Sequence, residues 1–232
     1  MNSIIHQPNY SRSREKQSAR LRNIKIFEIL TGRNKLSPTD LYITLCNIQD
    51  ATPHSEINQI VAENFCTKKQ FVGIDFDKDL IEKNQSIHPE ARFINDDWKQ
   101  ALNKIEFSGG LIYFDSTSLA EKDRACHALK KTLEFADHPE TVVIANVMMN
   151  NPHVFGGSAV AGQSDHLFDP ETLINNIFND NPYKWHKWNR NDSHVFKVPS
   201  YEYKTTNKTL MRSYIFFHGI MSEKKIELIN NL

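Results

Sequence analysis

Short apolar runs alternate with amphipathic stretches along most of the chain. Polar or turn-forming residues bound each run, and the stretches between the runs carry apolar residues at helical spacing. The runs predict strands at residues 41–45, 70–74, 91–95, 110–114 and 141–147. The stretches predict helices at residues 53–64, 79–85, 98–105 and 119–136. Because strands that alternate with helices usually pair in parallel, this order predicts an α/β fold with a doubly wound, mostly parallel sheet.

Both ends of the chain depart from this alternation. Residues 14–31 carry an apolar stripe that includes Leu21, and they predict a helical extension before the sheet. Apolar runs at residues 195–203 and 211–220 flank a polar turn and predict a C-terminal antiparallel hairpin. The remaining expectations are helices at 169–178 and 222–232, a loop at 150–165 that would cover a site, a basic tail and helix at 1–36, and an α/β domain at 37–232.

The composition is that of an ordinary globular protein. Hydrophobic residues make up 39% of the 232 residues and charged residues 24%, and no long uncharged apolar run is present. The three cysteines form no CxxC pair, and residues 1–22 lack the apolar segment of a secretion signal. These features predict a cytoplasmic protein in a reducing environment. The size and the unusual motifs would also suit a protein of a virus or a mobile element.

The net charge of zero hides an uneven distribution. Residues 1–35 hold eight basic and two acidic residues, so the rest of the chain carries a balancing excess of six negative charges. Such a segment could contact the phosphates of a nucleic acid, but a solvated helix and tail is the favoured interpretation. A second basic cluster contains Tyr183, Trp185 and Trp188, whose rings could stack on unpaired bases or pack against the edge of the sheet.

Carboxylates follow three of the predicted strands. Asp75, Asp97 and Asp115 each lie at or just after the end of a strand. Since the carboxyl ends of parallel strands meet at one edge of a sheet, these side chains are expected to share a ligand-binding cleft. The alternative for each is a helix N-cap or a first-turn residue, and this alternative is favoured for Asp77 and Asp79.

Three segments resemble motifs of the class I S-adenosylmethionine-dependent methyltransferases, which have a Rossmann-like fold. These segments are Val72-Gly73-Ile74-Asp75, Phe93-Ile94-Asn95-Asp96-Asp97 and Gly110-Leu111-Ile112-Tyr113-Phe114-Asp115. The resemblance implies that S-adenosylmethionine is the cofactor. It places Asp75 at the ribose hydroxyls, Asp97 near the adenine and Asp115 beside the methyl acceptor.

The loop after the first strand departs from this family. It normally carries several glycines where the backbone passes close to the cofactor, but residues 46–55 contain none. In this loop Asn47 and Asp50 could instead contact the amino acid part of the cofactor. Two hypotheses follow: a methyltransferase acting on nucleic acid, or a catalytically inactive methyltransferase-like protein that binds nucleic acid or a partner protein.

Other kinds of chemistry lack their sequence patterns. The chain contains neither the GxxxxGKS loop of nucleotide hydrolases nor the GxGxxG loop of dinucleotide-binding enzymes. Its ten histidines show no HxH or HxxxH spacing, so no metal site is expected.

Overall fold

A seven-stranded sheet forms the centre of the protein. The computed structural model describes residues 14–116, 122–148, 194–204 and 210–232. The strand order is β3-β2-β1-β4-β5-β7-β6, with β7 antiparallel to both of its neighbours and the other neighbouring pairs parallel. The strands are β1 Leu41–Leu45, β2 Phe71–Asp75, β3 Arg92–Asn95, β4 Gly110–Ser116, β5 Thr141–Met148, β6 His194–Lys204 and β7 Leu210–Gly219.

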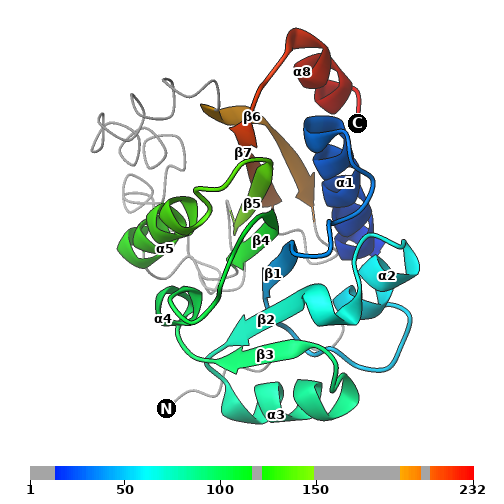
Figure 1. The fold of residues 1–232 in the computed structure, drawn as a ribbon, viewed down its shortest axis with the longest axis vertical. Coiled ribbons are helices and arrows are strands. Elements are labelled where there is room, and N and C mark those ends of the chain that lie inside the picture. The colour runs from blue at the N-terminus through cyan, green and yellow to red at the C-terminus, as the bar shows by residue number, and fades with distance from the viewer. Residues whose placement is uncertain (1–13, 117–121, 149–193, 205–209) are drawn as a thin grey trace, which may run out of the picture.

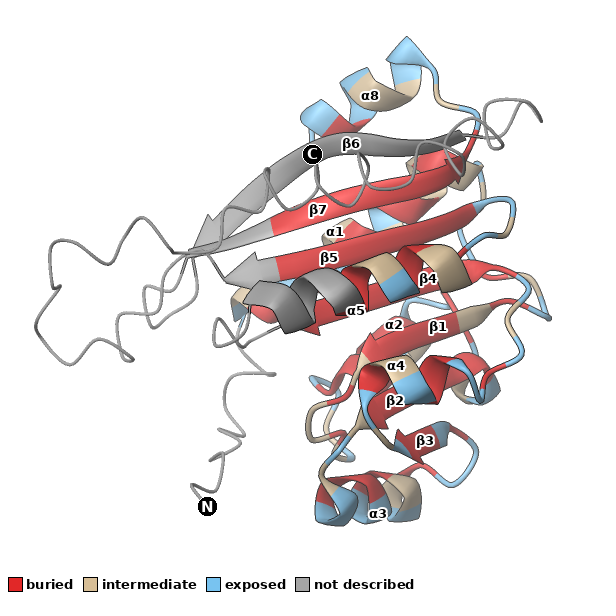
Figure 2. Cartoon of the chain, turned by 90° about the vertical axis from the view of Figure 1, so that its left-hand side faces the viewer, coloured by how far each residue is buried: buried red, intermediate tan, exposed pale blue. Residues whose placement is uncertain are grey.

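Helices cover both faces of this sheet (Figures 1 and 2). Apolar residues of α1, α2, α3 and α8 form one core with one face of the sheet. Those of α4 and α5 form a second core with the other face. The helices are α1 Arg14–Thr31, α2 Glu56–Ala62, α3 Lys78–Ile87, α4 Trp98–Leu102, α5 Lys122–Phe135 and α8 Glu223–Asn230, with a short 3-10 helix η1 at Lys68–Gln70.

The predicted fold class is confirmed: a mostly parallel α/β sheet with a C-terminal hairpin and an N-terminal helix. The bounds of α1 and β1 agree with the predicted residues, whereas α2 begins three residues later than expected. The turn before α2 explains the delay, because Asp50 Oδ1 accepts hydrogen bonds from Thr52 N at 3.0 Å and Thr52 Oγ1 at 2.5 Å. The expected helix at 169–178 and loop at 150–165 lie outside the described residues.

Helix α1 is apolar at one end of its buried face and ionic at the other. Ile26, Phe27 and Leu30 are fully buried in the core of the sheet, so α1 shares that core. Nearer the N-terminus, the buried positions are occupied by Lys16 and Arg20, each 2% exposed, while Leu21 is 41% exposed. The prediction of a solvated helix is therefore wrong for these two basic residues, and Leu21 does not belong to the buried stripe.

The C-terminal end of α1 is capped by two groups. Gly32 adopts a positive φ of 74°, and its N–H donates to Glu28 O at 2.8 Å, which ends the helix. Lys225 of α8 donates from Nζ to Leu30 O at 2.6 Å and so satisfies a carbonyl of the last turn. Within the described ranges, no helix combines the length and apolar character needed to cross a membrane.

Candidate functional site

Asp75 and Asp115 lie at the same level of the sheet, on the same face. Thr44 of β1 pairs with Gly73 on one side and with Tyr113 on the other, and both acids lie two residues beyond these partners. Side chains two residues apart on a strand point to the same face of the sheet. Asp75 therefore lies on the face of Gly73, and Asp115 on the face of Tyr113. Tyr113 belongs to the core beneath α1 and α2. The acids are therefore two strand spacings apart, roughly 10 Å, on the α1 and α2 face of the carboxyl edge.

Asp75 is the last residue of β2, and it is half-buried. The residue after it carries an exposed aromatic ring. Its Oδ1 accepts a hydrogen bond from Asp77 N at 2.8 Å, and a carboxylate has acceptor capacity for several donors. The next residue, Phe76, is 68% exposed. A phenylalanine left in water beside a strand-end carboxylate offers a flat apolar surface to a ligand. Phe76 was not predicted from the sequence, although its position directly after Asp75 was a usable signal.

Asp97 lies after β3 and serves as the N-cap of α4. Its Oδ1 accepts from Lys99 N at 3.0 Å, and the residue is exposed. The backbone of the preceding residue joins β3 to β2, because Asp96 N donates to Asp75 O at 3.0 Å. A hydrogen bond from Lys104 lowers the pKa of Asp96. The capping alternative is thus confirmed for Asp97, as it is for Asp77, which accepts from Leu80 N at 3.1 Å.

The loop after β1 is held by two buried amides rather than by glycines. Asn84 of α3, fully buried, donates to Asn47 O and Cys46 Sγ at 3.0 Å each and accepts from Gln49 N at 2.9 Å. Gln49, also fully buried, accepts from Ile57 N at 3.0 Å. No residue from 46 to 55 has a positive φ. The loop therefore keeps a backbone that ordinary residues adopt, which removes the conformational need for glycine.

The predicted loop ligands Asn47 and Asp50 are both partly buried beside this framework. The Asp50 carboxylate organises the turn before α2, and Asp50 O lies 3.2 Å from His88 Nε2. Their neighbour Gly73 is required by close packing, since an added Cβ would lie 2.8 Å from a ring carbon of Phe93 and 2.9 Å from Cys46 Sγ. The structure thus places Asn47 against α3 and Asp50 against His88, the residue that follows α3.

The His88 contact predicts a pH-dependent stability. His88 is 2% exposed, and its burial, followed by the nearby charge of Lys68, lowers its pKa below the usual 6.5. Below about pH 6.5, His88 takes up a proton more readily in the unfolded chain than in the folded chain. The free energy of unfolding therefore decreases as the pH is lowered, by up to about 1.4 kcal/mol per pH unit. Urea unfolding between about pH 7.5 and 5.5 should show a shallower loss for His88→Gln. Equal slopes in the two proteins would contradict this assignment.

Two buried ion pairs attach the N-terminal half of α1 to the sheet and to α2. Lys16 Nζ donates to Asp115 Oδ2, and both residues are buried. One turn later, Arg20 Nη2 lies 3.9 Å from Glu56 Oε2, and Arg20 Nη1 donates to His54 O at 3.4 Å. Tyr42 also donates its hydroxyl to Glu56 Oε1 at 2.7 Å. Burial, then the charge of Glu56, raises the pKa of Tyr42 well above its usual value, so this hydroxyl keeps its proton.

The polar layer continues across the neighbouring strands. Asn146 of β5 is paired in register with Asp115, and its Nδ2 donates to Tyr113 OH at 2.5 Å. Its Oδ1 accepts a hydrogen bond from Ser213 Oγ of β7. The three residues that these hydrogen bonds join, Tyr113, Asn146 and Ser213, are all buried. Asp115 therefore lies in a buried polar layer covered by α1, and its charged partner among the described residues is Lys16, which was expected to be solvated.

Solved structures share the fold of this chain. A methyltransferase from Anabaena variabilis, described as dependent on S-adenosylmethionine, is 13% identical, with a TM-score of 0.51 over 90% of this chain and 86% of that chain. WbdD is 15% identical, with a TM-score of 0.50 over 91% of this chain and 43% of that chain. The chain has the class I methyltransferase fold. No family model matches the sequence, and no curated protein does.

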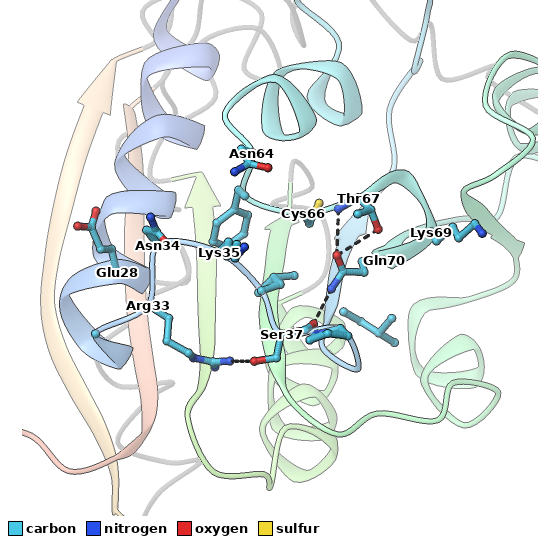
Figure 3. A pocket seen from close by; sticks show the side chains of 15 residues that line it. Glu28, Arg33, Asn34, Lys35, Ser37, Asn64, Cys66, Thr67, Lys69 and Gln70 are labelled. Carbon is cyan, nitrogen blue, oxygen red and sulfur yellow. Dashed lines mark hydrogen bonds between the residues drawn. The ribbon is translucent and has the colours of Figure 1, made fainter.

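A hollow of about 1070 Å³ lies at the opposite edge of this methyltransferase fold (Figure 3). The end of α1, the segment before β1 and the turn before β2 line it, and none of the strand-end acids does. Its polar side chains bond mainly to the protein: Arg33 donates to Asp40 at 2.7 Å, and Gln70 to Ser37 O at 2.6 Å. This hollow is therefore separate from the candidate site.

The nucleic-acid contact inferred from the sequence stays a prediction. Lys16 and Arg20 are paired in the interior, so they are not available for phosphates in this conformation. The aromatic part of the predicted contact, Tyr183, Trp185 and Trp188, lies outside the described residues. The described residues also contain no group of three or more His, Cys, Asp or Glu arranged to hold a metal ion.

Proposed function

We propose that the chain is an S-adenosylmethionine-dependent methyltransferase that binds its cofactor at the carboxyl ends of β1 and β2. The observation that carries this proposal is Asp75 at the end of β2, beside the exposed ring of Phe76 and level with Asp115. This set provides a hydroxyl acceptor, a stacking surface and a second carboxylate on a methyltransferase fold. The backbone of the glycine-free loop has no position whose φ requires glycine, so its conformation does not by itself favour the catalytically inactive alternative.

The residues present fit the parts of this cofactor. The carboxylate of Asp75 suits two ribose hydroxyls, since charge-assisted hydrogen bonds are the stronger kind. Phe76 suits the face of the adenine, and the outer oxygen of Asp97 suits its amino group. The carboxylate of Asp50 suits the ammonium of the amino acid part, and the amide of Asn47 suits its carboxylate. When bound, the cofactor supplies a methyl group on a positively charged sulfur.

Asp115 would orient the methyl acceptor by accepting a hydrogen bond from it. A lysine already occupies one oxygen of the carboxylate, so orientation suits this group better than removal of a proton. Nucleic acid, the acceptor predicted from the basic leading segment, offers suitable donors in base amino groups and ribose hydroxyls.

Calorimetric titration with S-adenosylhomocysteine, the demethylated form of the cofactor, tests this proposal. The wild type should bind, and Asp75→Asn should bind roughly 10- to 100-fold more weakly, because an amide N–H₂ cannot accept from a hydroxyl. Phe76→Ala should lose a comparable amount through the missing stacking surface. Asp79→Asn is the matched control, since Asp79 is exposed in the first turn of α3. Absence of heat with the wild type, or equal affinity of the two Asp variants, would remove the proposal.

A further inference from the structure

The ion pair between α1 and β4 joins residues that are 99 positions apart in the sequence. Lys16 is 2% exposed and Asp115 is 7% exposed, so both charges are removed from water. As a unit the pair is neutral, and removal of either partner would leave a buried charge without compensation. Asp115 therefore presents a hydrogen-bond acceptor to its surroundings without presenting a net negative charge.

Among the described residues, the second oxygen of the same carboxylate has no hydrogen-bond partner. Asp115 Oδ1 is buried, and no donor among the described residues reaches it. The adjacent amide of Asn146 is already engaged by Tyr113 and Ser213. Buried carboxylate oxygens are almost always paired, so an orphan at the acceptor position points to a donor supplied by a ligand.

Charges on the neighbouring elements also cancel in pairs. From α1, Arg20 faces Glu56 of α2, which also accepts from the protonated hydroxyl of Tyr42 on β1. On β2, Asp75 lies about two strand spacings away, where the positively charged cofactor would bind. Among these described groups, Arg20 and Glu56 compensate each other, and the charge of Asp75 is about two strand spacings from Asp115.

We propose that Lys16 is a positioning residue that makes Asp115 select a neutral N–H or O–H donor as methyl acceptor over an ammonium or guanidinium group. This inference rests on the proposed function. Its chemical basis is that a methyl acceptor reacts through a lone pair, which a hydroxyl or a neutral amine has and an ammonium lacks. An aspartate without Lys16 would instead attract cations. The substrate class is therefore neutral: a base amino group, an amide or a hydroxyl, but not a lysine or arginine side chain.

Three probes of similar shape and different charge test the selection: benzoate, benzamide and benzamidine. Ligand-observed NMR titrations would use the full chain with saturating S-adenosylhomocysteine. The wild type should favour neither charged probe over benzamide. Lys16→Met should raise the preference for benzamidine by about tenfold or more, and Asp115→Asn should raise that for benzoate to a similar extent. Lys16→Met/Asp115→Asn should return both ratios to the wild-type values, and Lys16→Arg should leave them unchanged.

Ratios that do not move in Lys16→Met and Asp115→Asn, including the case in which no probe binds, would overturn the inference. A double variant that keeps the altered ratios would do the same. If Lys16→Met fails to fold, Asp115→Asn and the double variant still test the inference. For a selective site, Asp115→Asn raises the preference for benzoate and the double variant does not. For a pair with only a structural role, both variants keep the wild-type ratios. The titration with S-adenosylhomocysteine is a separate readout, so failure of cofactor binding is distinguishable from failure of the charge selection.

Discussion

Replacement of Lys16 by methionine should lower the free energy of unfolding by about 3–5 kcal/mol, the largest stability effect expected in this protein. The cause is the Asp115 carboxylate, which stays buried while it loses the charge of Lys16. Urea denaturation followed by circular dichroism would measure the loss. A protein of this size should also melt many degrees lower.

Two variants make this result specific. Lys16→Met/Asp115→Asn should recover most of the lost stability, since two neutral groups of similar shape replace two buried charges. Lys25→Met should change stability by less than about 1 kcal/mol, because Lys25 is half exposed and pairs with Glu28 on the helix surface. A double variant as unstable as Lys16→Met would show that packing, rather than charge, dominates at this position.

Replacement of Asn84 by alanine should cost about 3 kcal/mol and also weaken the binding of S-adenosylhomocysteine. Asn84 is fully buried, and its removal takes the side-chain acceptor from Gln49 N and one of the donors from Asn47 O. Because these groups fix the loop that replaces the usual glycine-rich turn, the loss should appear in both urea denaturation and calorimetric titration.

Asn103→Ala is the matched control for this variant, because Asn103 is exposed at the end of α4. It should alter stability by less than about 0.5 kcal/mol and leave binding unchanged. Wild-type affinity in Asn84→Ala, together with a clear loss of stability, would separate the loop framework from the proposed cofactor site.

Periodicity was sufficient to locate the main elements. The apolar run of β1 and the helical spacing of α1 were found with their observed bounds, because both patterns depend on local spacing. The start of α2 was missed because Asp50 bonds to the backbone and side chain of Thr52 and forms a competing turn. The capping role of Asp77 followed from its position directly before a helix.

The chemistry of α1 was harder to infer from its sequence. Lys16, Arg20 and Asn23 occupy the same helical stripe as Ile26 and Leu30, yet charged residues on a helix usually face water. Their burial depends on acids that arrive from β4 and α2. Phe76 was missed for a related reason, since exposure of an aromatic residue depends on what the rest of the chain leaves uncovered.

The sequence by itself determined the order of strands and helices, the parallel α/β class and the placement of acids at strand ends. These properties follow from spacing along the chain, which a single sequence records. Only the tertiary structure decided that Asp115 is paired with Lys16, that Asn84 and Gln49 hold the first loop, and that Phe76 is exposed. Each of these depends on contacts between distant segments, whose free energy is gained only when the segments are brought together.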